Sequence, residues 1–238
     1  MKVLITGSSG FLAQHIISKL NSFGHQAICF SRSNNTEDLI GMIKQSDYCF
    51  HLAGEVRPKA SSKDFNDSNV NFTKKILNYL QTYNPVPIVF SSTIHAGHTN
   101  NDYGNSKLLA EQLIKIYGID NIVPTHIYRL PHLFGIGAKE NYNSVFTTWV
   151  FRALRGEDLI VFDYDFMMHY IQVDELSHTF VQQLINADTL PLPQTYNISL
   201  GDLKQRIQMV SSLKSAENLN KFDSYIFDMF QDARKRVG

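Results

Sequence analysis

The sequence predicts a doubly wound α/β fold, in which helices cover both faces of a parallel sheet, followed by a small C-terminal lobe. Between Lys2 and Tyr128, short apolar runs alternate with segments of helical periodicity, as in successive βαβ units. Each run is apolar along almost its whole length rather than at every second residue. That pattern is typical of parallel strands buried on both faces.

The strands are expected in the apolar runs, and the helices where apolar residues recur every three or four positions. The expected strands are residues 2–6, 26–30, 48–53, 86–91 and 122–128. The expected helices are residues 11–23, 36–45, 69–83 and 103–117. Thr36 is a suitable N-cap for the second helix. Residues 54–64 are polar and contain Pro58, so we expect a loop there.

The pattern loosens after residue 130, where proline and glycine recur. We therefore expect residues 1–130 to form the sheet domain. Residues 131–238 are expected to form mainly a substrate-binding lobe that is intertwined with the sheet domain rather than independent of it. Within the lobe, a helix is expected at residues 145–154 and a strand at residues 159–162.

Composition excludes several classes of partner. The formal net charge is zero and charged residues make up 18% of the chain, so no basic surface for nucleic acid is expected. No apolar run approaches the length of a membrane span, and the chain enters its first strand directly, so we expect a cytoplasmic protein. Cys29 and Cys49 lie in separate strand-like runs, and we expect both to be buried thiols. No Cys/His spacing suggests a metal site.

A glycine turn joins the first strand to the first helix, in the sequence Gly7-Ser8-Ser9-Gly10-Phe11-Leu12-Ala13. Gly7 permits the tight turn, and Gly10 lets the backbone approach a pyrophosphate at the positive end of the helix. Ala13 is small enough for close packing of helix on strand. In this strand–turn–helix context the pattern predicts a Rossmann-type dinucleotide site formed by Gly7, Ser9, Gly10, Phe11 and Leu12.

The residue after the second strand selects between the two nicotinamide dinucleotides. A carboxylate there binds the ribose 2′-hydroxyl of NAD, whereas this chain has Arg32 between two serines. A guanidinium favours a 2′-phosphate, so we expect NADP(H) in preference to NAD(H). Leu52, Ala53 and Gly54 end the third strand and would let the cofactor lie against bare backbone.

A proton donor is expected in the helix at residues 103–117. Tyr103 and Lys107 are four residues apart and share one helix face, and Thr93 ends the strand before them. Reduction of a ketone leaves an alkoxide that needs a proton. We expect Tyr103 to supply it, with its pKa lowered by Lys107 and by the oxidised nicotinamide, and Thr93 to hydrogen-bond the carbonyl oxygen.

Several segments together resemble the extended short-chain dehydrogenase/reductases (NAD-dependent epimerase/dehydratase family), over essentially the whole chain. These are His51-Leu52-Ala53-Gly54 with Arg57-Pro58, Tyr103-Gly104-Asn105-Ser106-Lys107, Leu133-Phe134-Gly135, Asn141-Tyr142-Asn143-Ser144-Val145 and Leu200-Gly201-Asp202-Leu203. Within that family the chain is most similar to the reductase domain of bifunctional capsular-polysaccharide enzymes. The resemblance implies NADPH-dependent reduction of the 4-keto group of a UDP-2-acetamido-2,6-dideoxyhexulose. It also implies a homodimer formed through the helices at residues 69–83 and 103–117.

The resemblance further implies substrate contacts from Arg57, His132, Asn143 and Ser144, with Arg57 pairing a phosphate. Two positions differ from many relatives. His132 stands where those relatives have a substrate-binding asparagine, and the run from Met168 to Asp174 lacks their diphosphate-binding arginine. The cupin domain that follows the reductase domain in the bifunctional enzymes is not expected within these residues.

Two other functions are compatible with the same residues. One is a nucleotide-sugar 4-epimerase that regenerates a tightly bound NAD. Dehydration is disfavoured, because Ile94 and His95 replace the acidic pair that follows the catalytic threonine in dehydratases. The other is a regulatory protein that binds NADP(H) without turnover, although such proteins usually lose the tyrosine or the lysine.

Overall fold

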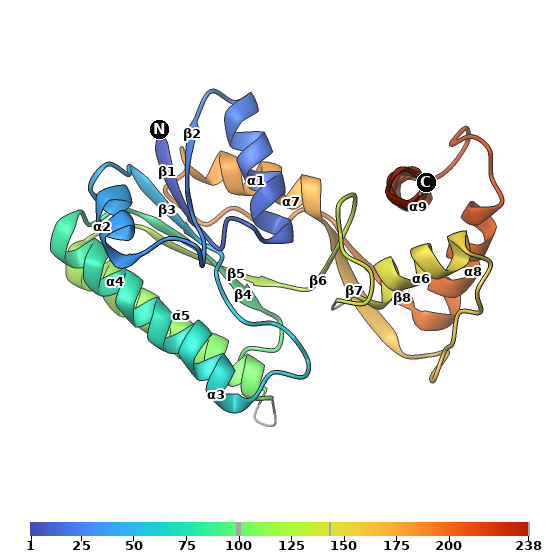
Figure 1. Ribbon diagram of the computed structural model, residues 1–238, viewed down its shortest axis with the longest axis horizontal. Coiled ribbons are helices and arrows are strands. Elements are labelled where there is room, and N and C mark those ends of the chain that lie inside the picture. Colours follow the sequence, from blue (N-terminus) through green and yellow to red (C-terminus); the bar gives the residue numbers. More distant parts are fainter. Residues whose placement is uncertain (99–100, 143, 238) are drawn as a thin grey trace. The chain divides into compact units, whose positions relative to one another are not determined.

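We describe residues 1–98, 101–142 and 144–237 in a computed structural model (Figure 1). The chain forms two compact units. Unit 1 contains Met1–Leu130 and Leu176–Leu192, and unit 2 contains Pro131–Glu175 and Pro193–Gly238. The chain therefore enters unit 2 at Pro131, returns to unit 1 through Leu176, and finishes in unit 2.

Unit 1 contains a five-stranded parallel sheet in the order β2-β1-β3-β4-β5, which confirms the predicted fold class. The strands are β1 (Lys2–Thr6), β2 (Gln26–Phe30), β3 (Tyr48–His51), β4 (Ile88–Thr93) and β5 (Thr125–Leu130). The helical segments are α1 (Phe11–Ser22), α2 (Thr36–Lys44), α3 (Ser62–Phe65), the π-helical turn η1 (Asn66–Asn71), α4 (Phe72–Tyr83), α5 (Asp102–Asn121) and most of α7 (Val173–Gln183).

Helices cover both faces of this sheet, with α1 and α7 on one face and α2, α4 and α5 on the other (Figure 1). Apolar side chains of α2, α4 and α5 pack with those of β1, β3 and β4 in one core cluster, which includes Leu39, Leu80 and Ile114. On the opposite face Phe180 of α7 meets Phe50 of β3, with ring centroids 6.0 Å apart. Burial on both faces explains the continuous apolar runs of β1, β3 and β4, whereas burial alternates along β2 and β5.

Four local expectations for unit 1 were wrong. Asn35, not Thr36, caps α2, because its side chain accepts from the Asp38 amide in a reciprocal capping box. The segment expected as a loop becomes helical at Ser62, where Ser61 forms a second capping box. Ile122 does not begin a strand; it ends α5 with a left-handed φ of 54°. Cys29 is exposed rather than buried, and it points to the face of β2 opposite the buried side chains of Ile28 and Phe30.

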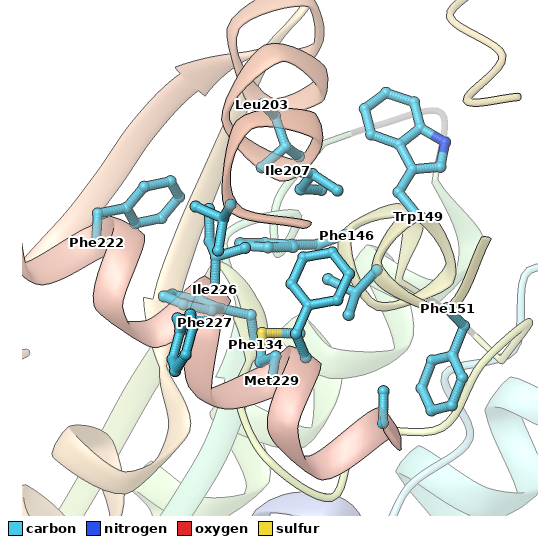
Figure 2. Close-up of a cluster of buried hydrophobic side chains, with 14 of the residues drawn as sticks. Phe134, Phe146, Trp149, Phe151, Leu203, Ile207, Phe222, Ile226, Phe227 and Met229 are labelled. Carbon is cyan, nitrogen blue, oxygen red and sulfur yellow. The ribbon is translucent and has the colours of Figure 1, made fainter. Parts of the chain in front are cut away.

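Unit 2 contains a three-stranded sheet in the order β6-β7-β8, parallel between β6 and β7 and antiparallel between β7 and β8. Its elements are β6 (His132–Phe134), α6 (Val145–Leu154), β7 (Met167–Gln172), β8 (Thr195–Ser199), α8 (Leu200–Ser211) and α9 (Lys221–Val237). Its core combines aromatic and aliphatic side chains, and the stacked rings of Phe134 and Phe146 lie 4.8 Å apart between centroids (Figure 2).

The strand expected at residues 159–162 does not form. Leu159 is buried in the unit 2 core, but Ile160 and Phe162 are 55% and 97% exposed. An apolar run becomes a strand only where a neighbouring strand satisfies its backbone, and among the described residues none pairs with this segment. The helix expected at residues 145–154 is confirmed as α6.

Candidate active site

The turn between β1 and α1 is built by glycine. Gly7 has a φ of +68°, and a Cβ atom there would lie 2.8 Å from the Ala53 Cα atom just after β3. Gly10 precedes α1 as its N-cap and offers no side chain to the first backbone N–H groups of the helix. Those N–H groups carry the positive end of the helix dipole, so the turn provides an anion site beside a bare stretch of backbone.

The remaining residues of the expected cofactor site lie on this turn or just after β3. Ser9 is exposed and Phe11 is partly exposed, whereas the Leu12 side chain is buried, so Leu12 can offer a ligand only its backbone. Leu52 and Ala53 are partly exposed after β3. Gly54 is also required for packing, because a Cβ atom there would lie 2.7 Å from the Asn69 Oδ1 atom.

The catalytic residues expected from the sequence lie together in unit 1. The side chain of Asn101 caps α5 by accepting from the Gly104 amide at 2.9 Å, which places Tyr103 in the first turn. Thr93 is buried at the end of β4, and its hydroxyl hydrogen-bonds the Tyr103 phenol. The His95 amide also donates to the Thr93 Oγ1 atom, at 3.2 Å.

The pKa of Tyr103 is shifted in the opposite direction to the lowering expected from the sequence. Burial raises the pKa of its phenol to about 12, while the hydrogen bond with Thr93 acts in the opposite direction. The phenol is therefore protonated at neutral pH, which is the form that donates a proton. Lowering this pKa requires a positive charge at the phenol.

Lys107 is almost completely buried on α5, with its Nζ atom 4.2 Å above the centre of the Phe90 ring. Burial lowers the pKa of Lys107 to about 7, and the Glu111 carboxylate one helical turn further on acts in the opposite direction. Lys107 therefore changes charge near neutral pH, and the negative charge of Glu111 raises the pH at which this change occurs.

Glu111 was not identified from the sequence. It is 1% exposed and accepts from the Ser92 hydroxyl at 2.5 Å and from Arg129 through two hydrogen bonds of 2.9 and 2.8 Å. Burial raises the pKa of Glu111, but these hydrogen bonds outweigh burial and hold the pKa below its usual range. The result is a permanent negative charge beneath Lys107.

Asn69, in the π-helical turn η1, was also missed, and it connects two parts of the site. Its Oδ1 atom accepts from the Glu55 amide at 2.7 Å, and its Nδ2 atom donates to the Glu55 carbonyl and to the Ser106 hydroxyl. Asn69 is 1% exposed, so these partners replace water. The loop after β3 is thus fixed to the helix that carries Tyr103.

A buried histidine links the glycine turn to Asn69. The Thr73 hydroxyl donates to the Asn69 carbonyl, so its oxygen must accept from the Nε2–H group of His51, at 2.8 Å. The Nδ1 atom of His51 then accepts from the Thr6 hydroxyl at 2.7 Å, and the Thr6 oxygen accepts from the Ala53 amide. This chain of bonds requires a neutral imidazole.

The Glu55 carboxylate is approached by both Arg32 and Arg57. From the sequence, Arg32 was expected at the cofactor and Arg57 at the substrate. Arg57 makes a bidentate ion pair with Glu55, and the nearest Arg32 nitrogen is 3.8 Å from the Glu55 Oε2 atom. Glu55 is buried, whereas both arginine side chains are largely exposed.

The other expected substrate residues belong to unit 2. His132 begins β6, is partly buried, and lies beside the ring of Tyr170. The Ser144 side chain caps α6 by accepting from the Thr147 amide at 3.4 Å. Asn143 lies outside the described residues. Within residues 1–98, 101–142 and 144–237, no three His, Cys, Asp or Glu side chains are grouped to hold a metal ion.

A family model described as the NAD dependent epimerase/dehydratase family matches residues 3–199. The chain belongs to this family. The glycine turn, the uncapped end of α1 and the bare backbone after β3 fit the dinucleotide of its name. No helix within the described residues is long and apolar enough to cross a membrane.

A family member from Pseudomonas aeruginosa, named UDP-2-acetamido-2,6-beta-L-arabino-hexul-4-ose reductase, is 30% identical over 213 residues, which cover 87% of this chain and 57% of that protein. The crystal structure of capsular polysaccharide assembling protein CapF from Staphylococcus aureus is 28% identical, with a TM-score of 0.85 over 98% of this chain and 66% of that chain. UDP-glucose 4-epimerase from Thermotoga maritima shares the fold, with a TM-score of 0.85 at 17% identity over the whole of both chains. The chain thus spans less than two thirds of the first two relatives.

Proposed function

We propose that this chain is an NADPH-dependent reductase of the 4-keto group of a nucleotide-linked deoxy sugar, UDP-2-acetamido-2,6-dideoxyhexulose, in surface-polysaccharide synthesis in the cytoplasm. The observation that carries the proposal is the arrangement of the buried Thr93 and Lys107 with the half-buried Tyr103 at the carboxyl edge of the sheet. The 30% identity to a 4-ketohexulose reductase supports the choice of substrate.

Each residue has a defined task in this reaction. The dinucleotide, held at the turn formed by Gly7 and Gly10, supplies hydride when bound. Tyr103 gives its phenolic proton to the alkoxide oxygen, a stronger base than a phenolate with a pKa of about 12. Thr93 donates a hydrogen bond to the same oxygen as its negative charge develops. Protonated Lys107 stabilises the phenolate that remains.

Arg32 supports NADP(H) as the cofactor, because its 84% exposed guanidinium follows β2 where the adenosine ribose is expected. The roles of His132, Asn143 and Ser144 in binding substrate belong to the same proposal. So does the role of residues 131–238 as mainly the substrate lobe, now without residues 176–192, which belong to unit 1. A homodimer through α4 and α5 is supported by Leu109, Ile116 and Ile119, which are 48%, 55% and 76% exposed on α5. A monomer in sedimentation velocity would contradict the dimer.

The proposal is tested by NADPH consumption with UDP-, dTDP- and GDP-linked 4-ketohexoses. Tyr103→Phe should lower turnover of the UDP sugar by about 10²- to 10⁴-fold, the usual contribution of a general acid, with unchanged NADPH affinity. Tyr83→Phe, at an exposed end of α4, is the matched control and should keep full turnover. Retained turnover in Tyr103→Phe would remove it as the proton donor.

The same assay separates the other two functions. A 4-epimerase would interconvert nucleotide sugars with no net consumption of NADPH. A regulatory protein would bind NADP(H) and reduce none of the sugars. Either result would overturn the proposed reductase activity.

A further inference from the structure

An acidic residue lies behind the two arginines at the cofactor edge of unit 1. Glu55 follows β3, and its side chain is 4% exposed, against 54% for Arg57 and 84% for Arg32. Arg57 donates from its Nε atom to Oε1 at 2.9 Å and from a terminal nitrogen to Oε2 at 2.6 Å. The Arg32 guanidinium approaches the same Oε2 atom at 3.8 Å.

The Glu55 carboxylate is already used within the protein. Its Oε1 atom also accepts from the backbone amides of Val56 and Arg57, at 2.9 and 2.8 Å. Hydrogen bonds from the Arg57 side chain are the main reason that the pKa of Glu55 falls to about 2, so the charge persists at every pH of interest. With these donors in place, Glu55 holds an arginine rather than presenting an acceptor to a ribose hydroxyl.

The backbone of Glu55 is equally fixed. Asn69 pairs with both its amide and its carbonyl, and Asn69 is itself buried against Ser106 of α5. A rigid backbone and a bidentate ion pair together place the Arg57 guanidinium before any ligand arrives. Such preorganisation lowers the entropic cost of binding.

The place of this pair in the sheet indicates its ligand. Arg32 follows β2 and Glu55 follows β3, and these strands flank β1, whose glycine turn lies between them. In a doubly wound sheet the residue after the second strand faces the 2′ position of the adenosine ribose. Two guanidinium groups and one carboxylate leave a net positive charge there, which suits a phosphate monoester and gives a neutral hydroxyl no comparable partner.

We infer that Arg57, held in place by Glu55, binds the 2′-phosphate of the cofactor together with Arg32. The inference rests on the proposed use of NADP(H) and makes Arg57 a specificity-determining residue. It also moves Arg57 from the substrate phosphate, where the sequence resemblance placed it, to the cofactor.

Binding of nucleotide fragments to the full chain tests this inference without turnover. Adenosine 2′,5′-bisphosphate carries the 2′-phosphate, and 5′-AMP lacks it. By titration calorimetry, Arg57→Ala should bind the bisphosphate about 10- to 100-fold more weakly, the effect of losing a charge-assisted hydrogen-bond pair, and should bind 5′-AMP as the wild type does. Lys59→Ala, at an exposed cation in the same loop, should change neither affinity.

Arg57→Lys covers the possibility that alanine leaves the buried carboxylate unpaired and the chain unfolded. Lysine keeps the counter-charge but lacks the planar fork, so bisphosphate affinity should fall between those of the wild type and Arg57→Ala. Bisphosphate affinity that drops in Arg32→Ala but stays at the wild-type value in both Arg57 variants would overturn the inference and leave NADP(H) use intact. A wild type that binds both nucleotides equally would overturn NADP(H) use as well.

Discussion

The hydrogen-bond chain through His51 makes stability depend on pH in a way that can be measured. His51 is completely buried between Thr6 and Thr73. Burial, and then the charge of Lys107, lower its pKa to about 3, against about 6.5 in an unfolded chain. Between pH 6.5 and pH 3 the His51 imidazole therefore binds a proton in the unfolded chain but not in the folded protein. Stability contributed by the neutral imidazole is then lost as the pH falls.

The size of this loss follows from proton linkage. Each pH unit between the two pKa values is worth about 1.4 kcal/mol, so His51 should remove about 2.5 kcal/mol of unfolding free energy between pH 7 and pH 4.5. His51→Gln abolishes the titration. The variant should be less stable at pH 7, because it loses buried hydrogen bonds, but its further loss on acidification should be smaller by that amount.

Urea unfolding at pH 7.0, 5.5 and 4.5, followed by circular dichroism, gives the two pH dependences. Carboxylates titrate equally in both proteins and cancel in the comparison. His98→Gln, at an exposed histidine, should show the wild-type dependence. Equal losses in the wild type and His51→Gln would refute the buried neutral imidazole.

Two further predictions concern the glycine turn and the charge beneath Lys107. Gly7→Ala should cost about 3 kcal/mol in urea unfolding, from the left-handed backbone and the clash with Ala53 together, whereas Gly24→Ala, with a similar φ of +74° and no atom within 4 Å of its Cβ position, should cost only about 1 kcal/mol. Equal costs would show that the approach to Ala53 is not tight. Glu111→Gln removes the charge that raises the pKa of Lys107, so the alkaline limb of kcat/KM should move to lower pH, and an unmoved limb would contradict that coupling.

Local sequence patterns were sufficient for much of the fold. The five parallel strands were predicted because each lies in an apolar run, which is a property of neighbouring residues in the sequence, and β1, β3 and β4 are buried on both faces as such runs indicate. Failures arose where the outcome depends on a neighbour. The apolar run at residues 159–162 has no strand to pair with among the described residues, and Cys29 is exposed although Ile28 and Phe30 beside it in β2 are buried.

The sequence by itself determined the doubly wound sheet, the glycine turn at Gly7, and the spacing of Tyr103 and Lys107 on one helix face, since each depends on residues close together in the chain. Only the tertiary structure decided which polar groups are buried against one another. Asn69 reaches Glu55 and Ser106, His51 reaches Thr6 and Thr73, and Glu111 reaches Arg129. A polar side chain can be buried only where a distant segment supplies its hydrogen-bond partner, and that pairing exists only once the chain has folded.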